Sequence, residues 1–252
     1  MKKQNKKKIT AENNSEGTAK HFIERLYTYR SEVELMKHHR YFTFDEKSTT
    51  DRFIGVRMGQ VFVLAKEFSE MPPDEIEKLL ESPIHEVRAG AVSIMDKQSR
   101  GKKTTEQRKK ELFDLYIRRH DRINNWDLVD LGCLYMIGNY LLDKPRKILY
   151  KLAESKNMWE RRTAIVGTAY LIRKKHVDDV FTIAEMLMHE KEDQVSKGTG
   201  WMLRFAGDVD RHRLLHFLDT YAAIMPRVAL RNAIEHLDKK QREHYLHFKD
   251  KT

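Results

Sequence analysis

Apolar residues recur at helical intervals along most of the chain. Residues 21–36 carry them every three or four positions. A polar connector follows at 43–52, and residues 53–56 then lead into another helix that runs to about residue 68. Because this spacing places apolar side chains on one face of a helix, the pattern predicts amphipathic helices joined by polar turns. Pro72 and Pro73 mark a strong break before the next helix.

The predicted helices then repeat as pairs. A helix, a turn and a second helix occupy residues 76–95, and the same plan recurs at 148–172 and from residue 180 onward. Arg162 and Trp201 stand 39 positions apart, in equivalent places of successive pairs. A helical-pair repeat of about 40 residues is typical of HEAT-like arrays. The sequence therefore predicts an all-α, HEAT-like helical-repeat solenoid, an α-α superhelix with a concave groove lined by one helix of each pair.

Composition and charge add to this prediction. The chain has 252 residues, of which 34% are charged and 40% hydrophobic, with 11 glycines and 5 prolines, and this balance favours helix over strand. We expect a basic, disordered tail at residues 1–18 and a single HEAT-like domain over 19–252. The formal net charge of +10 makes a polyanion a plausible partner if the positive charge gathers on one face.

Several classes of protein are disfavoured. Cys133 is the single cysteine, which rules out an internal disulfide, and the 12 histidines lack metal-ligand spacing, so we expect no metal and no cofactor. No apolar run approaches the roughly 18 residues of a membrane span, so we expect a cytoplasmic protein without a membrane partner. Gly-rich phosphate loops and Ser or Cys nucleophile motifs are also missing.

Trp126 and Asp130 stand out because they lie one helical turn apart, on a different face from the apolar stripe around Leu128 and Val129. Taken singly, the simplest interpretation of Asp130 is a surface aspartate paired with a nearby Lys or Arg. Trp126 and Trp201 would by the same logic be ordinary core residues. Arg161 and Arg162 would be a solvated face or an ion pair with a neighbouring Glu.

The repeat register favours a functional interpretation, because it places five residues at comparable positions along one groove: Arg88, Trp126, Asp130, Arg162 and Trp201. Arginines position phosphates, and indole rings offer flat faces to sugars or bases. A carboxylate repels phosphate, so Asp130 needs a separate explanation. Cleavage of an N-glycosidic bond builds positive charge on the sugar, which a fixed carboxylate stabilises. An N-alkylated purine is already cationic and leaves without a general acid.

Together these residues resemble the AlkD family of DNA alkylation repair glycosylases, which are built on HEAT-like repeats. The resemblance runs from about residue 36 to 246. It rests on short motifs at residues 40–42, 53–57, 64–68, 123–130, 152–155, 159–162, 200–204, 225–227 and 230–231.

The resemblance implies a role for each matching residue. Asp130 would be the catalytic aspartate, Trp126 and Trp201 would cradle the sugar of the lesion nucleotide, and Arg162 would contact DNA. Further DNA-binding candidates are Tyr41, Arg161, Arg204, Arg88 and Arg227. Glycosylases generally flip the target base into a pocket, whereas members of this family are understood to leave the lesion in the duplex.

The sequence also departs from the family pattern. Phe205 stands where many relatives have Glu, Asp208 where a lysine is common, and Gly59 and Phe62 replace an expected Pro and Arg. Losing basic residues predicts weaker phosphate contacts.

We therefore expect a DNA glycosylase that acts in base excision repair on cationic N3- or N7-alkylated purines in duplex DNA, as a nucleoid-associated monomer. One alternative is a non-catalytic HEAT-repeat protein that binds distorted or branched DNA. A protein-interaction scaffold, which would show no salt-dependent DNA binding, is the other.

Overall fold

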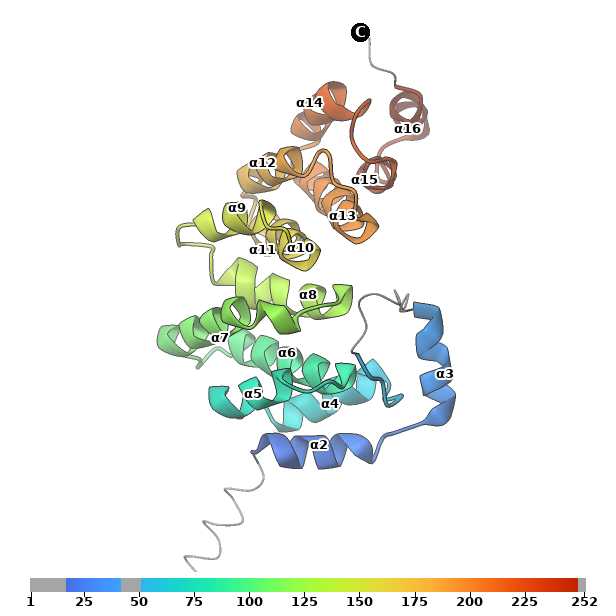
Figure 1. Cartoon of the computed structure of the whole chain (residues 1–252). Coiled ribbons are helices and arrows are strands. Elements are labelled where there is room, and N and C mark those ends of the chain that lie inside the picture. Colours follow the sequence, from blue (N-terminus) through green and yellow to red (C-terminus); the bar gives the residue numbers. More distant parts are fainter. Residues whose placement is uncertain (1–16, 42–50, 249–252) are drawn as a thin grey trace, which may run out of the picture. The chain divides into compact units, whose positions relative to one another are not determined.

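The computed structural model describes residues 17–41 and 51–248, without the side chains of residues 38–41. These residues form helices joined by short turns (Figure 1), and the described part contains no β-strand beyond an isolated bridge between Arg52 and Ile84. The all-α prediction is confirmed. The chain divides into two compact units, Met1–Arg122 and Ile123–Thr252. A single domain over residues 19–252 and a tail at 1–18 stay predictions, and most of the tail lies outside the described residues.

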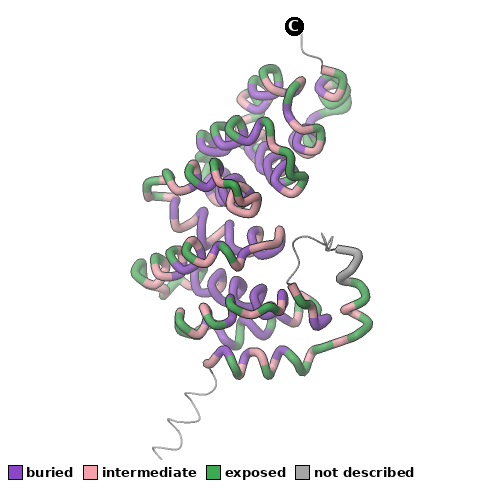
Figure 2. The backbone as a smooth tube through the Cα atoms, in the orientation of Figure 1, coloured by how far each residue is buried: buried purple, intermediate pink, exposed green. Residues whose placement is uncertain are grey.

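The first unit is organised around one long buried helix. Its elements are α2 (Ala19–Tyr27), α3 (Glu32–Tyr41), α4 (Met58–Glu67), α5 (Pro73–Leu80), α6 (His85–Arg100), α7 (Glu106–Arg118) and the 3-10 turn η1 (His120–Arg122). Helix α6 packs against α4, α5 and α7. Nearly all of its residues are buried, as the purple tube of Figure 2 shows, so it forms the centre of this unit's core.

The helix predicted over residues 21–36 is two helices in the structure. Helix α2 ends at Tyr27, where the Thr28 hydroxyl donates to the carbonyl of Arg25 at 2.7 Å, and α3 begins at Glu32. Ser31 then accepts from the backbone N–H of Glu34 through its hydroxyl. Short hydroxyl side chains compete with the helical ladder in this way. The apolar spacing continues across the break, so periodicity alone could not reveal it.

The segment before α4 is held by a buried carboxylate. Glu86 accepts hydrogen bonds from the backbone N–H groups of Ile54 at 3.0 Å, Gly55 at 2.9 Å and Val56 at 3.3 Å. Gly55 has φ 76°, and a Cβ at this position would lie 2.1 Å from the carbonyl oxygen of Ser31. Only glycine fits this conformation without strain, which explains the Gly within the motif at residues 53–57.

The second unit is a series of helical pairs. It comprises α8 (Trp126–Gly132), the π-helix η2 (Cys133–Asn139), α9 (Lys147–Ala153), α10 (Met158–Val166), α11 (Ala169–Arg173), α12 (Asp178–Met186), α13 (Asp193–Val209), α14 (Arg211–Tyr221), α15 (Arg227–Ala233) and α16 (Lys239–Leu246). Helices α8, α10, α13 and α15 form one row in which each packs on the next.

A second layer covers this row. Helix α9 packs on α10, α12 packs on α9, α10 and α13, and α14 packs on α13. The pairs α9–α10 and α12–α13 correspond to the repeats predicted at 148–172 and from residue 180. The second helix predicted through residue 172 is divided, because α10 ends at Val166 and α11 begins at Ala169. The row of successive second helices is the arrangement expected of a helical repeat, since each helix buries its apolar face against its neighbours. The superhelix and its concave groove stay predictions.

Candidate functional site

The site is built on the start of α8. The side chain of Asn125, whose backbone is extended, accepts from the N–H of Trp126 at 2.8 Å, and the Asp127 carboxylate accepts from the N–H of Leu128 at 2.9 Å. Asn and Asp side chains satisfy the N–H groups that a helix leaves without partners at its beginning. The helix therefore starts abruptly at Trp126, and Asp130 follows one turn later.

Helix α8 is anchored on its apolar side. Leu128 and Val129 are fully buried, as the sequence pattern predicts, whereas Trp126 and Asp130 are only partly buried. After Gly132 the chain continues as the π-helix η2, and the buried thiol of Cys133 approaches the carbonyl of Thr163 on α10, with 3.9 Å between sulfur and oxygen. Wide helical turns of this kind are rare and often occur at functional sites.

Asp130 and Arg162 form a two-point ion pair between α8 and α10. The Nε atom of Arg162 donates to Oδ1 of Asp130 at 3.1 Å, and Nη2 donates to Oδ2 at 2.8 Å. The third guanidinium nitrogen, Nη1, donates to the backbone carbonyl of Gln194 in the first turn of α13. Arg162 thus connects three successive helices of the row, and its planar group fixes the plane of the carboxylate.

Burial within this pair differs between its two partners. Only 5% of the Arg162 side chain is accessible, whereas 21% of the Asp130 side chain is. The Asp130 side chain therefore keeps some accessible surface, while the Arg162 guanidinium is enclosed.

The electrostatic state of Asp130 follows from this environment. Burial raises the pKa of Asp130, the charge and hydrogen bonds of Arg162 lower it, and the neighbouring Asp127 raises it, with a net result above the ordinary value. A raised pKa means that the ionised carboxylate is less well stabilised than in water. An additional positive charge near Asp130 would therefore be attracted strongly.

Trp201 lies one helix further along the row, on α13. Its ring meets that of Phe205 edge-on, with centroids 5.6 Å apart. Gly198, one turn earlier on α13, lies against the guanidinium of Arg162, and a Cβ placed there would be 3.4 Å from Nη1. Residues three apart share a helix face. Trp126 with Asp130, Arg162 and Trp201 thus occupy the three neighbouring helices α8, α10 and α13.

The other arginines predicted to bind DNA in this unit differ in what they contact. Arg161 donates to both carboxylate oxygens of Glu190, at 2.6 and 3.0 Å, and Arg204 pairs with Glu235. Arg227 is exposed and donates to the backbone carbonyl of Leu246. Arg161 and Arg204 thus hold helices together, and Arg227 is the more accessible cation.

Two predicted DNA contacts belong to the first unit. Arg88 is 1% exposed, and its guanidinium donates to Asp51 at 2.6 Å and to the carbonyl of Ser82 at 2.8 Å. The backbone of Tyr41 ends α3, but its side chain lies outside the described residues. The DNA-binding roles assigned to both residues stay predictions.

Sequence reasoning missed three groups that shape the site. Asp127 acts on the pKa of Asp130, Glu190 neutralises Arg161, and the carbonyl of Gln194 receives Arg162. The effect of Asp127 could have been predicted from the sequence, because Asp127 precedes Asp130 by three positions and so lies one helical turn away. The contacts of Glu190 and Gln194 could not have been predicted from local spacing, since they join residues about 30 positions apart.

The described residues offer neither a metal-ligand cluster nor a membrane-spanning helix. No group of three or more His, Cys, Asp or Glu side chains is arranged to hold a metal ion among residues 17–41 and 51–248. Within the same ranges, no helix combines the length and the apolar character that crossing a membrane requires.

Comparison with known proteins is consistent with this geometry. A sequence model for the DNA alkylation repair enzyme family matches residues 22–237. A solved structure described as a predicted DNA alkylation repair enzyme from Enterococcus faecalis is similar, with a TM-score of 0.65 and 16% sequence identity, over 83% of this chain and 97% of that one. At this identity the similarity concerns the fold. No curated protein matches the sequence.

Proposed function

Because the chain belongs to the DNA alkylation repair enzyme family, we propose that it is a DNA glycosylase acting on cationic N3- or N7-alkylated purines in duplex DNA. The observation that supports this best is the Asp130 carboxylate, which Arg162 holds in one plane while the side chain stays partly exposed. We further propose that it acts as a monomer and without a cofactor.

The chemistry requires one carboxylate. When the bond between the sugar C1′ and the purine nitrogen breaks, the electron pair leaves with the base, which becomes neutral, and positive charge develops on the deoxyribose. Asp130 stabilises that charge through space. Water then adds to C1′ and loses its proton, which yields an abasic site and a free alkylated base.

The raised pKa of Asp130 supports this role. An ionised carboxylate that is poorly compensated in the free protein gains more from a nearby cation than a well-solvated one does, so the attraction strengthens as the sugar cation develops. Trp126 and Trp201 would hold the deoxyribose against their ring faces. Arg162 acts as a positioning residue, because it fixes the carboxylate through two hydrogen bonds and its own positive charge cannot stabilise the sugar cation.

The test is release of free base from methylated duplex DNA. We expect wild type to release 7-methylguanine and 3-methyladenine, and Asp130→Asn to be slower by about 100-fold or more, the scale of losing one electrostatic stabiliser. Asp143→Asn, which alters an exposed carboxyl group of the same unit, is the matched control and should keep full activity. Absence of release by wild type, or equal release by Asp130→Asn, would overturn the proposal.

A second function is supported by the way Asp130 uses both oxygens to bind Arg162, as a purely structural ion pair would. In that case the protein binds distorted or branched DNA without cleaving it. Tight binding to a branched duplex, no base release, and a large loss of thermal stability in Asp130→Asn would favour this function.

A further inference from the structure

A basic cavity of about 610 Å³ lies in the first unit. We call it the lysine cavity. It lies where the C-terminal end of α6 meets the beginning of α7, and it is lined by Ser69, Glu70, Lys97, Gln98, Gly101, Lys102, Lys103, Thr104, Thr105 and Arg108. Four of these residues are cationic and one is acidic. The volume is within the range of sites that hold small ligands.

The three lysines of the cavity, Lys97, Lys102 and Lys103, form neither a hydrogen bond nor an ion pair with another described residue. Lys97 does interact through its charge with the neighbouring Asp96, and this interaction lowers the pKa of that carboxyl group. Lysines on the adjacent helix α7 behave differently, because Lys109 pairs with Glu106 at 2.8 Å and Lys110 with Asp114 at 2.5 Å. Among the described lysines of the first unit, Lys66 is the one other lysine without such a pair, so most of the unpaired lysines of this unit line the cavity.

The backbone holds two of these charges side by side. The N–H of Thr104 donates to the carbonyl of Gly101 at 3.1 Å, which closes a turn with Lys102 and Lys103 at its two central positions. The Thr104 hydroxyl also donates to the carbonyl of Gln98 at 2.6 Å, so the turn is tied to the end of α6. Turns favour Gly, Asn, Asp and Pro at their centres. Both lysines are exposed, so their ammonium groups are accessible from solvent.

Hydrogen bonds fix the side chains of Arg108 and Gln98, which also line the cavity. Arg108 donates through Nε to the side-chain oxygen of Gln98 at 3.0 Å and through Nη2 to the carbonyl of Met71 at 2.8 Å. Gln98 donates to the same carbonyl at 2.7 Å. This network fixes the guanidinium at the edge of the cavity, where its Nη1 atom also lies 3.6 Å from Oε2 of Glu111. A ligand would thus meet one fixed cation and three ammonium groups that are free to turn toward it.

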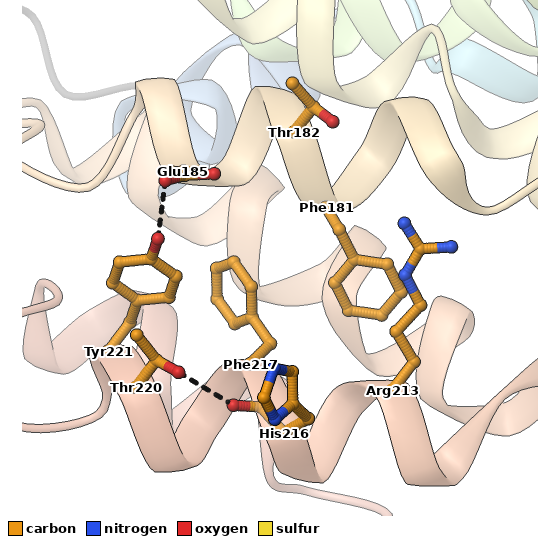
Figure 3. Close-up of a pocket in the computed structure, with 8 residues that line it drawn as sticks. All are labelled: Phe181, Thr182, Glu185, Arg213, His216, Phe217, Thr220 and Tyr221. Carbon is orange, nitrogen blue, oxygen red and sulfur yellow. Dashed lines mark hydrogen bonds between the residues drawn. The ribbon is translucent and has the colours of Figure 1, made fainter.

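A second cavity, in the other unit, has none of these properties. It has a volume of about 310 Å³ and lies between α12 and α14, with Phe181 and Phe217 in its wall (Figure 3). Its charged groups already bind one another or nearby residues, because Tyr221 donates to Glu185 at 2.5 Å and Arg213 pairs with Asp178. Internal pairing accounts for these side chains without a ligand.

We propose that the lysine cavity is a binding site for phosphate groups, built from residues other than those around Asp130. Three unpaired ammonium groups and a fixed guanidinium match a ligand with several negative oxygens. Two sources of such oxygens are a free polyphosphate compound and the backbone of a DNA strand. The site does not depend on base release, so it can be tested whether or not the protein is a glycosylase.

The experiment measures binding by the full-length protein of two probes, inorganic tripolyphosphate and an undamaged DNA duplex, at several salt concentrations. The test variant is Lys102→Gln/Lys103→Gln, with Lys97→Gln as a second change from the helix side. The matched control is Lys151→Gln/Lys240→Gln, which removes the same charge from two exposed lysines outside the cavity. Thermal unfolding checks that each variant folds.

Weaker tripolyphosphate binding by about tenfold in the cavity variants, with the control unchanged, would support the site and identify a free ligand. For a DNA backbone, the slope of log affinity against log salt should fall by about two in the double variant and stay the same in the control. Equal losses in the cavity variants and in the control would show an effect of net charge only and overturn the proposal. No binding of either probe by wild type would do the same.

Discussion

Asp130 is bound by a guanidinium and yet has a raised pKa. Its two oxygens bind a buried guanidinium, which would normally lower its pKa, yet burial and the nearby Asp127 leave the pKa above the ordinary value. Isolated in sequence, this residue has no feature that separates it from a surface aspartate. Its charge state depends on its burial, on Asp127 of α8 and on Arg162 of α10, and its proposed role depends on the same contacts.

A pH dependence follows from this charge state. Only the ionised form of Asp130 stabilises a cation, so base release should fall as the pH drops through the raised pKa of this group. The acidic limb should therefore lie above about pH 4, the ordinary range of an aspartate. Arg162→Gln removes the group that lowers the pKa, so its limb should shift to still higher pH.

The measurement is the single-turnover rate of 7-methylguanine release against pH for wild type, Arg162→Gln and Arg162→Lys, corrected for release without protein. Arg162→Lys keeps the charge and should shift the limb less. If Arg162 has only a structural role, the two variants would lose activity without any change in the shape of the profile.

At the scale of elements, Arg161 and Glu190 join α10 to the connection between α12 and α13. Burial raises the pKa of Glu190. Hydrogen bonds from Arg161 and from the backbone N–H groups of Glu192 and Lys191 lower it by more, so the net shift of the pKa is downward. A carboxylate with a lowered pKa stabilises the fold above its unfolded-state pKa. That contribution is lost as the pH falls through its folded-state pKa.

Glu190→Gln should therefore lower the free energy of unfolding at neutral pH by about 1–3 kcal/mol, since it leaves Arg161 without its charged partner. Below about pH 4.5 the difference from wild type should shrink, because Glu190 itself becomes protonated. Urea unfolding at several pH values tests this. A difference that is constant with pH would contradict it.

Contact between α13 and α15 depends on a glycine. A Cβ at Gly200 would lie 2.2 Å from the carbonyl oxygen of Ala229 and 2.6 Å from the Cβ of Asn232, so the two helices would have to move apart. Gly200→Ala should destabilise the protein by about 1–3 kcal/mol despite the better helix propensity of alanine.

Gly59 is the matched control, because it lies in α4 at a position where an added methyl group would meet no neighbouring segment within 4 Å. Gly59→Ala should raise stability by about 0.5–1 kcal/mol through helix propensity alone. Thermal and urea unfolding of both variants distinguish the two effects. Similar changes in the free energy of unfolding of the two variants would mean that α13 and α15 are not in close contact.

At the scale of the whole molecule, the net charge of +10 predicts salt-dependent binding to DNA, but the arginines differ in their availability. Arg227 is exposed, whereas Arg88 is enclosed with Asp51. Arg227→Gln should lower the salt slope of duplex binding by about one and leave stability unchanged.

Arg88→Gln should do the opposite. It should cost about 3 kcal/mol of stability, as expected when a buried ion pair is broken, and leave the salt slope as in wild type. Binding titrations at several salt concentrations, with urea unfolding of the same samples, measure both quantities. A reduced slope in Arg88→Gln would instead support the DNA-binding role predicted from the sequence.

The sequence by itself determined the helical class, the pairing of helices near a 40-residue repeat, and the position of Trp126 and Asp130 on one turn. These properties follow from local spacing, because helix geometry relates residues three, four and seven apart. The sequence pattern did not predict the break between α2 and α3, since the apolar spacing continues across the hydrogen bonds of Thr28 and Ser31.

Only the tertiary structure decided what each arginine binds. Arg162 meets Asp130 across 32 positions, Arg161 meets Glu190 across 29 and Arg88 meets Asp51 across 37. Arginines in a regular pattern look alike in sequence, because the pattern specifies the face of a helix and not the carboxylate that folding brings to it. The unpaired lysines of the lysine cavity were likewise visible only once the partners of the other charges were known.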